Sequence, residues 1–223
     1  MAVRGRPESG YAKGDETRQR LLDVALAAFG EAPFGEVTTR QIAAAARVSL
    51  PSLQYYFGDK EGLYRACAEA IVERFRSHTA AHAAHAREVL GKGCDPETAR
   101  VHLRTLIGAL GGFLIGSDEA ASWGHFVARE LRDPGPAFEI LYERLWRPGV
   151  ETTALLIARI LGTSEGDSAV RVQALLLISS ALAFQSGRRI AMRTMHWSAI
   201  GHEQRAIVLA GLNLQIDAIG RSR

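Results

Sequence analysis

The polar and aromatic side chains of residues 38–57 have the types and spacing that suit contacts to nucleic acid. The segment reads TTRQIAAAARVSLPSLQYYF. The amide of Gln54 can pair with the edge of adenine, whereas the Ser52 and tyrosine hydroxyls suit bases or phosphate oxygens. The candidate DNA contacts are Thr38, Thr39, Arg40, Arg47, Ser49, Leu50, Pro51, Ser52, Gln54, Tyr55, Tyr56 and Lys60.

Two short helices joined by a tight turn would present these side chains. We predict that Thr38 caps a helix ending at Ala45 and that Ser49 caps another ending near Phe57. Proline in a first helical turn costs no hydrogen bond, so Pro51 is compatible with this reading. Shared apolar positions complete the pattern of a helix-turn-helix. They are Ile42, Val48, Leu53 and Phe57.

The second half of the chain carries aromatic and polar residues that could bind a small molecule. Pockets combine an apolar, aromatic lining with a few polar groups that orient the ligand. Trp123, Phe126 and Trp146 are the strongest group, although a lone aromatic on a helix more often belongs to the core. The candidate ligand contacts are His102, Phe113, Trp123, Phe126, Arg129, Tyr142, Trp146, Phe184 and Arg188.

Three histidines on one helical face raise the question of a metal site. His78, His82 and His85 are spaced at i, i+4 and i+7, with Cys94 as a conceivable fourth ligand. Their neighbours are mostly alanine and offer no carboxylate support. We therefore expect solvated histidines, no resident metal and no cofactor.

The pattern of breaks and apolar positions predicts an all-α chain. Residues 1–14 are expected to form a flexible basic arm, 15–60 a helix-turn-helix domain and 61–223 a ligand-binding and dimerisation domain. A helix starting at Asp15 or Thr17 precedes the pair described above. Asp59 is expected to cap a long helix that begins at Lys60 and stops at Gly91, and further helices follow it. The later ranges are 96–116, 119–132, 136–161 (kinked or split at Pro148), 167–195 and 202–219.

Composition narrows the class of protein. The 223 residues are 47% hydrophobic and 23% charged with a net charge of +3, so bulk charge alone does not establish a nucleic-acid partner. The two cysteines form no disulfide framework, and the start has no apolar leader. The longest uncharged run, 172–187, is too short to span a bilayer. We therefore expect a cytoplasmic protein outside the membrane. Within that run, apolar residues are spread around all sides of the expected helix. This suits a dimer interface formed together with 207–216, or else an ordinary monomer core.

Residues 17–66 resemble the DNA-binding head of the TetR repressor family. The resemblance rests on Leu21-Leu22, Ala25-Phe29, Phe34-Gly35, Thr38-Thr39, Ile42-Ala43, Val48-Ser49, Tyr55-Tyr56-Phe57 and Lys60-Glu61-Gly62-Leu63. Two positions depart from it. Arg47 stands where the family usually has glycine, and Tyr55-Tyr56 stand where Tyr-His is common. These departures make the pattern of base contacts hard to transfer.

The second half resembles the ligand domain of CecR-like regulators. The matching stretches are 128–138, 142–148 and 156–162. Together the resemblances imply a homodimeric repressor that binds a pseudo-palindromic, double-stranded operator and is released by an unknown small-molecule effector. No nucleophile elbow, P-loop, HExxH motif or carboxylate pair supports the rival reading of an enzyme. A helical interaction protein without DNA is the third reading, which the polar face of 38–57 disfavours.

Overall fold

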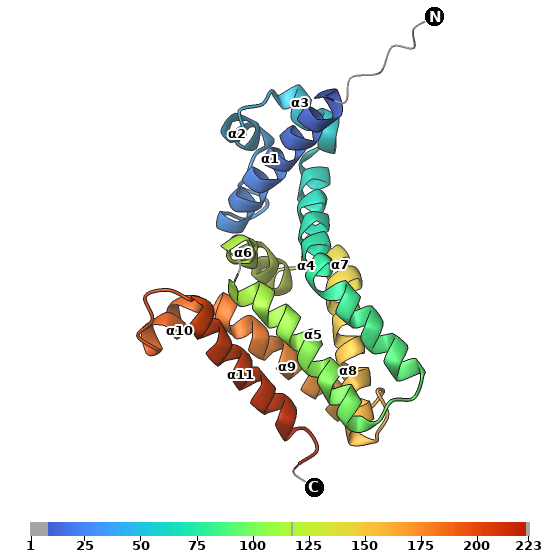
Figure 1. Cartoon of the computed structure of the whole chain (residues 1–223). Coiled ribbons are helices and arrows are strands. Elements are labelled where there is room, and N and C mark those ends of the chain that lie inside the picture. Colours follow the sequence, from blue (N-terminus) through green and yellow to red (C-terminus); the bar gives the residue numbers. More distant parts are fainter. Residues whose placement is uncertain (1–8, 117, 222–223) are drawn as a thin grey trace, which may run out of the picture.

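A small helical head sits on a larger helical bundle in the computed structural model, which describes residues 9–116 and 118–221 (Figure 1). The described residues are all helix, turn or irregular, which confirms the predicted all-α class. The head contains α1 (Ser9–Glu31), α2 (Thr39–Ala45) and α3 (Leu50–Phe57). The remaining elements are α4 (Lys60–Gly91), α5 (Pro96–Gly116), α6 (Asp118–Arg132), α7 (Phe138–Leu141), the π-helical η1 (Tyr142–Trp146), α8 (Arg147–Leu161), α9 (Ser168–Ser186), α10 (Arg188–Thr194) and α11 (His202–Ala218).

Local caps define the two short helices of the head. The Thr38 hydroxyl accepts from the Gln41 backbone N–H at 3.2 Å, and the side-chain Oε1 of Gln41 accepts from the Thr38 backbone N–H at 2.9 Å, which is a capping box. Ser49 caps α3 by accepting from the Ser52 N–H, with Pro51 in the first turn. These helices begin where the sequence predicts them.

Arg47 closes the turn between α2 and α3 in a backbone conformation that favours glycine. Its φ is +55°, its N–H donates to the Ala44 carbonyl, and the Val48 N–H donates to the Ala43 carbonyl. This pair of bonds is a Schellman motif with Arg47 at the left-handed position after the helix. An L-residue with a β-carbon is strained there, by about 1–2 kcal/mol.

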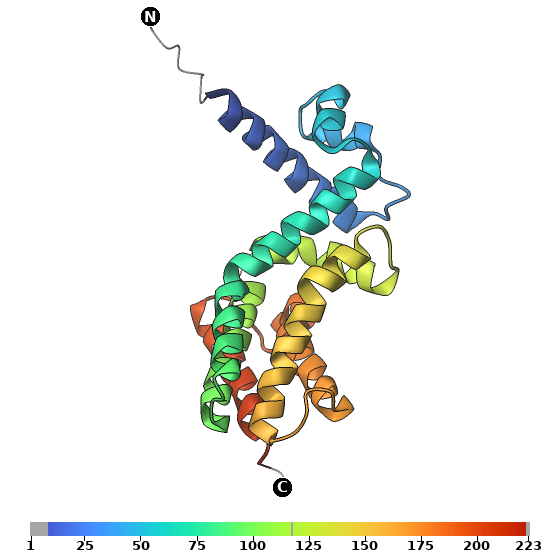
Figure 2. The same ribbon diagram turned by 90° about the vertical axis from the view of Figure 1, so that its right-hand side faces the viewer.

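The long helix α4 connects the head to the far end of the bundle (Figures 1 and 2). Its upper part packs against α1 and α3, and its lower part packs against α5 and α8. Helices α5, α8, α9 and α11 form the bundle, whereas α6 lies directly beneath α1. The apolar core is continuous from head to bundle, so α4 belongs to both.

The structure departs from the expected elements in three places. Helix α1 already includes Ser9, so the predicted arm overlaps a helix, and its residues 1–8 lie outside the described part. The 136–161 helix, predicted to be kinked or split at Pro148, is instead divided before that residue, into α7, η1 and α8. Pro148 has no N–H, so it cannot donate the helical hydrogen bond to the preceding turn. That preceding turn is the wider π turn of η1.

The third departure is at Gly187, which separates α9 from α10 within the predicted 167–195 helix. A β-carbon there would lie 2.7 Å from the Ala183 carbonyl oxygen. In the described part, α9 is also the one helix long and apolar enough, by length and composition alone, to cross a membrane. It packs against α5, α6, α8 and α11 instead, which makes it a bundle helix.

Candidate nucleic-acid interface and ligand cavity

The outer face of α3 and the ends of α2 present polar and aromatic groups to solvent. Arg40, Arg47 and Gln54 are exposed, and Tyr55 is 84% exposed beside the half-buried Tyr56. The two tyrosine rings pack edge to face, with centroids 5.3 Å apart. Such a large aromatic surface left in water on a short, capped helix is suited to lie against another molecule.

Beneath this face, Leu53 and Phe57 anchor α3 in the head core. The guanidinium of Arg18 lies 5.5 Å from the centre of the Phe57 ring. Leu53 packs in the same core as Ile42 of α2 and Leu22 of α1. One side of α3 is therefore packed against the head core and the other is exposed to solvent, as a recognition helix requires.

Three predicted contact residues, Ser49, Ser52 and Lys60, have structural roles as well. The Ser49 and Ser52 hydroxyls are hydrogen-bonded at 2.8 Å, so the Ser52 hydroxyl is engaged at the cap of its own helix. The Lys60 ammonium lies 4.4 Å from the centre of the Phe34 ring, and Asp59 accepts from the Gly62 N–H at 2.8 Å. A phosphate at the start of α4 would thus share that end with the Asp59 carboxylate.

The remaining predicted contacts surround these. Thr38 and Pro51 are exposed, whereas Thr39 and Leu50 are half-buried. All twelve candidates lie on α2, α3, the turn between them or the start of α4, and so they form one end of the molecule. Contact of each with DNA stays a prediction.

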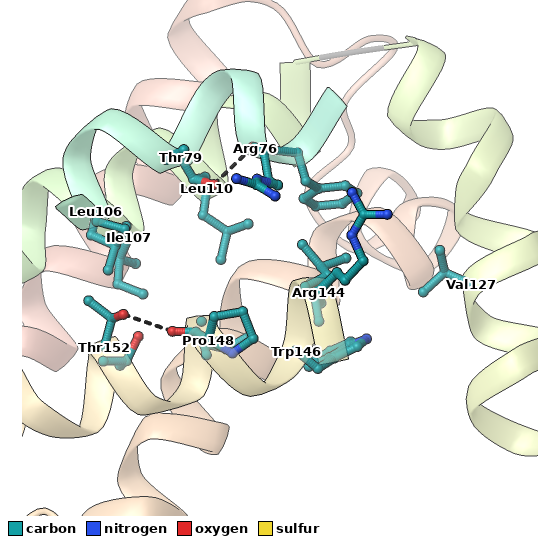
Figure 3. A pocket seen from close by; sticks show the side chains of 18 of the residues that line it. Arg76, Thr79, Leu106, Ile107, Leu110, Val127, Arg144, Trp146, Pro148 and Thr152 are labelled. Atoms are coloured by element: carbon teal, nitrogen blue, oxygen red, sulfur yellow. Dashed lines mark hydrogen bonds between the residues drawn. The ribbon is translucent and has the colours of Figure 1, made fainter. Parts of the chain in front are cut away.

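A cavity of about 540 Å³ lies between α4, α5, α8 and the ends of α6 and α9. Its size suits a drug-sized molecule, since ligand pockets usually measure about 300–1,000 Å³. Figure 3 shows Thr79 and Leu110 above Pro148 and Thr152 across the space. Apolar groups dominate the lining, with Phe75, Leu106, Ile107, Leu110, Trp123, Val127, Leu145, Trp146, Ile178 and Leu182 among them.

Of the predicted ligand contacts, Trp123 and Trp146 line this cavity. Phe113 lies next to it, stacked on His78 with ring centroids 4.2 Å apart. Tyr142 is 43% exposed and stacks on Phe138 outside the cavity. The other predicted contacts, His102, Phe126, Arg129, Phe184 and Arg188, are also absent from the lining.

Sequence reasoning missed the threonines that line the cavity. Thr152 and Thr153 are buried on α8, and the Thr152 hydroxyl donates to the Pro148 carbonyl at 2.7 Å. Thr79 faces them from α4, and its hydroxyl donates to the Phe75 carbonyl at 2.9 Å. Two adjacent threonines just before the apolar run of α8 were the available signal.

Phe126 and Arg129 belong instead to the junction between head and bundle. Phe126 packs against Tyr64 of α4 with ring centroids 4.7 Å apart, and Tyr64 also contacts Phe29 and Phe34 of the head. The Arg129 guanidinium donates to the carbonyl of Gly30 at the end of α1, at 3.1 Å. Helix α6 is thereby bound directly to the head.

A buried carboxylate completes the junction. Glu130 is 1% exposed and accepts from the Tyr64 hydroxyl at 2.7 Å and from the Gly135 N–H at 3.1 Å. Burial, reinforced by the hydrogen bond to Glu130, raises the pKa of Tyr64 far above its ordinary value. Tyr64 therefore stays a neutral hydrogen-bond donor at physiological pH.

The histidines of α4 have separate neighbours. The His78 ring stacks on Phe113 and its Nδ1 lies 2.9 Å from the Arg74 carbonyl, while the His85 ring meets His102 at 5.0 Å. His82 is exposed. Within residues 9–116 and 118–221, no three His, Cys, Asp or Glu side chains come together as metal ligands would.

An apolar strip on α9 and α11 faces solvent in the single chain. Val172 and Leu176 of α9 are 53% and 62% exposed, and Ile207 and Leu214 of α11 are 54% and 70% exposed. A salt bridge joins α11 to α5, where Arg104 lies 2.5 Å from Asp217 and lowers the pKa of that carboxyl. We call Val172, Leu176, Ile207 and Leu214 the α9–α11 strip.

Comparison with known proteins gives matches over both parts of the chain. The family described as "Bacterial regulatory proteins, tetR family" matches residues 21–67, and the C-terminal domain of the HTH-type transcriptional dual regulator CecR matches residues 99–219. The CecR protein of Shigella flexneri is 30% identical over 211 residues, covering 93% of this chain and 92% of that protein.

Solved structures give the same fold. A TetR-like transcriptional regulator from Rhodococcus sp. RHA1 superposes with a TM-score of 0.61 at 20% identity, covering 93% of this chain and 97% of the other. AmtR of Mycobacterium smegmatis also reaches a TM-score of 0.61, at 18% identity over 92% and 87% of the two chains.

Proposed function

The chain belongs to the TetR family of DNA-binding transcription regulators, a non-enzymatic family, and carries a CecR-type C-terminal domain; we propose that it is a ligand-released repressor. In this proposal it acts in the cytoplasm as a homodimer on a pseudo-palindromic, double-stranded operator. An effector held in the cavity lowers its affinity for that operator.

The single observation that carries the proposal is the exposed face of α3. Gln54 and Tyr55 project from a short helix whose other side is fixed by Leu53 and Phe57. An exposed glutamine in a major groove can pair with adenine, while tyrosine hydroxyls and arginines hold phosphates. Arg40 on α2 and Arg47 in the turn flank the same face.

The α9–α11 strip supports dimerisation. Its four large side chains are all at least half exposed in the single chain, which is costly in water and favourable in an interface. A two-fold axis through this strip would pair α9 and α11 with their copies as a four-helix interface. The dimer would then present two α3 helices to half-sites about 34–36 Å apart, one turn of DNA.

Effector release would act through the junction. Trp123 and Arg144 line the cavity and also a smaller hollow of about 340 Å³ between α1 and α4. Arg144 is ion-paired with Glu69 of α4, and α6 carries both Trp123 and the junction residue Glu130. A ligand that moves Trp123 or Arg144 therefore shifts α4 and α6 relative to the head. A coupling of about 1–3 kcal/mol would weaken operator binding roughly 5–150-fold.

Footprinting on the DNA upstream of the protein's own gene tests the proposal. We expect a protected pseudo-palindrome whose half-site centres are about ten base pairs apart, and lower transcript yield when protein is added to a reconstituted transcription reaction. The CecR relative is named a dual regulator, so activation at some promoters is the second candidate. Protection without change in transcript, or no protection, would contradict repression.

A further inference from the structure

We propose that the cavity binds an apolar organic anion, whose body fills the space between α4 and α8 and whose acidic group pairs with Arg76. This rests on the proposed function, because it names the chemistry of the effector. The charges around the cavity are unequal. The lining contains three arginines, Arg76, Arg87 and Arg144, against one glutamate, Glu143.

The available carboxylates are already used by other partners. Glu143 is paired with Arg147, which lies outside the lining, and Glu69 is paired with Arg144. In the part of the chain that the structure describes, neither Arg76 nor Arg87 has a carboxylate partner. Arg87 donates to the Pro148 carbonyl at 3.1 Å. The cavity therefore carries positive charge that the chain itself leaves unbalanced.

Helix α4 arranges this charge along one face. Arg76, Ala80, Ala83 and Arg87 follow at spacings of three or four residues, Thr79 lies beside Ala80, and all of them line the cavity. Such positions lie on one side of a helix. The small side chains of Ala80 and Ala83 leave room between the two arginines, whose Cα atoms are separated by about 16 Å of helix axis.

Arg76 is the better partner for an acidic group. It is exposed to solvent while lining the cavity, so the cavity opens beside it. Figure 3 shows Arg76 and Arg144 extending into the same side of the cavity, away from Thr152. A guanidinium at the mouth can hold a carboxylate, sulfonate or phosphate that keeps part of its hydration, while the apolar body is buried. A neutral apolar molecule would leave this charge unused, and a cation would be repelled.

Two dyes that share an apolar body test the proposal. 8-Anilinonaphthalene-1-sulfonate carries a sulfonate that N-phenyl-1-naphthylamine lacks, and both become fluorescent in apolar sites. We expect the full-length protein to bind the sulfonate at least about fivefold more tightly at constant ionic strength. In Arg76→Met the preference should fall to about one, while the neutral dye binds as before. Equal binding of both dyes by the unmodified protein would overturn the proposal.

Two further variants locate the bound dye. Arg65→Met removes an exposed arginine of α4 that is paired with Glu61 and lies outside the cavity, so it should keep the preference. Ala83→Leu fills the cavity and should weaken both dyes. A preference that survives Arg76→Met, or binding that Ala83→Leu leaves unchanged, would place the anion elsewhere and overturn the assignment. None of these measurements uses DNA, so their failure is separate from a failure of operator binding.

Discussion

The α3 surface and the cavity differ in how much of the chain must fold to make each. The α3 surface is formed by residues 38–60, and its caps, turn and exposed side chains are set within that segment. The cavity takes its lining from α4, α5, α6, η1, α8 and α9, which span residues 60–186. One surface is local, and the other exists only when distant helices pack together.

This difference suggests separate sensitivities. A substitution on the α3 surface can change recognition and leave the fold intact, because its side chains point into water. A substitution around the cavity or junction changes packing as well as binding. The two regions meet at Tyr64, Phe126 and Glu130, where the head and the bundle share buried contacts.

Breaking the proposed dimer should lower DNA binding by the head most, although the change lies far from it. Leu176→Asp places a charge in the α9–α11 strip, where Leu176 is 62% exposed in the single chain. We expect a monomer by sedimentation equilibrium and an operator affinity lowered about 10²–10⁴-fold, because the second half-site no longer binds intramolecularly. Val101→Asp, at a 50% exposed valine of α5, is the matched control. A dimeric Leu176→Asp protein would refute the assigned interface.

Removing two contacts from the head should abolish recognition without unfolding it. The double variant Arg40→Ala, Tyr55→Ala changes two exposed side chains. Hydrogen bonds to charged groups contribute about 1.5–3 kcal/mol each, so operator affinity should fall more than about 100-fold. Circular dichroism and the melting temperature should stay unchanged. Wild-type affinity in this variant would show that another surface binds DNA.

The junction should show a loss of stability. Tyr64→Phe removes the hydroxyl that donates to Glu130 and leaves a buried carboxylate with fewer partners. We expect the free energy of unfolding to fall by about 1–3 kcal/mol in urea titrations. Tyr142→Phe, which alters a 43% exposed ring, should have no such effect. Equal stability of the two variants would mean that the buried hydrogen bond contributes nothing.

Arg47 offers the smallest and most local test. Arg47→Gly and Arg47→Ala both remove a charge, but only alanine keeps a β-carbon at φ +55°. The free energy of unfolding of the glycine variant should be about 1 kcal/mol higher than that of the alanine variant. Both should lose a similar part of operator affinity if the guanidinium contacts a phosphate. Equal stability of the pair would show that the turn is unstrained.

The extent to which the sequence predicts each region follows from the same difference. The caps at Thr38, Ser49 and Asp59 depend on neighbours three residues away, so α2, α3 and the start of α4 could be placed closely. Trp123 and Phe126 lie one turn apart on α6, yet Trp123 lines the cavity and Phe126 contacts Tyr64. Which helix packs against each turn is a tertiary fact that spacing alone does not contain.

Fluorescence anisotropy of the purified protein on DNA from upstream of its own gene tests the central claim most directly. We would measure binding at 50 and 200 mM salt, with excess unrelated DNA as competitor. We expect tight, saturable binding that survives the competitor and weakens steeply with salt, because phosphate contacts release counterions. No binding at low salt would contradict the assignment of the α3 surface to DNA.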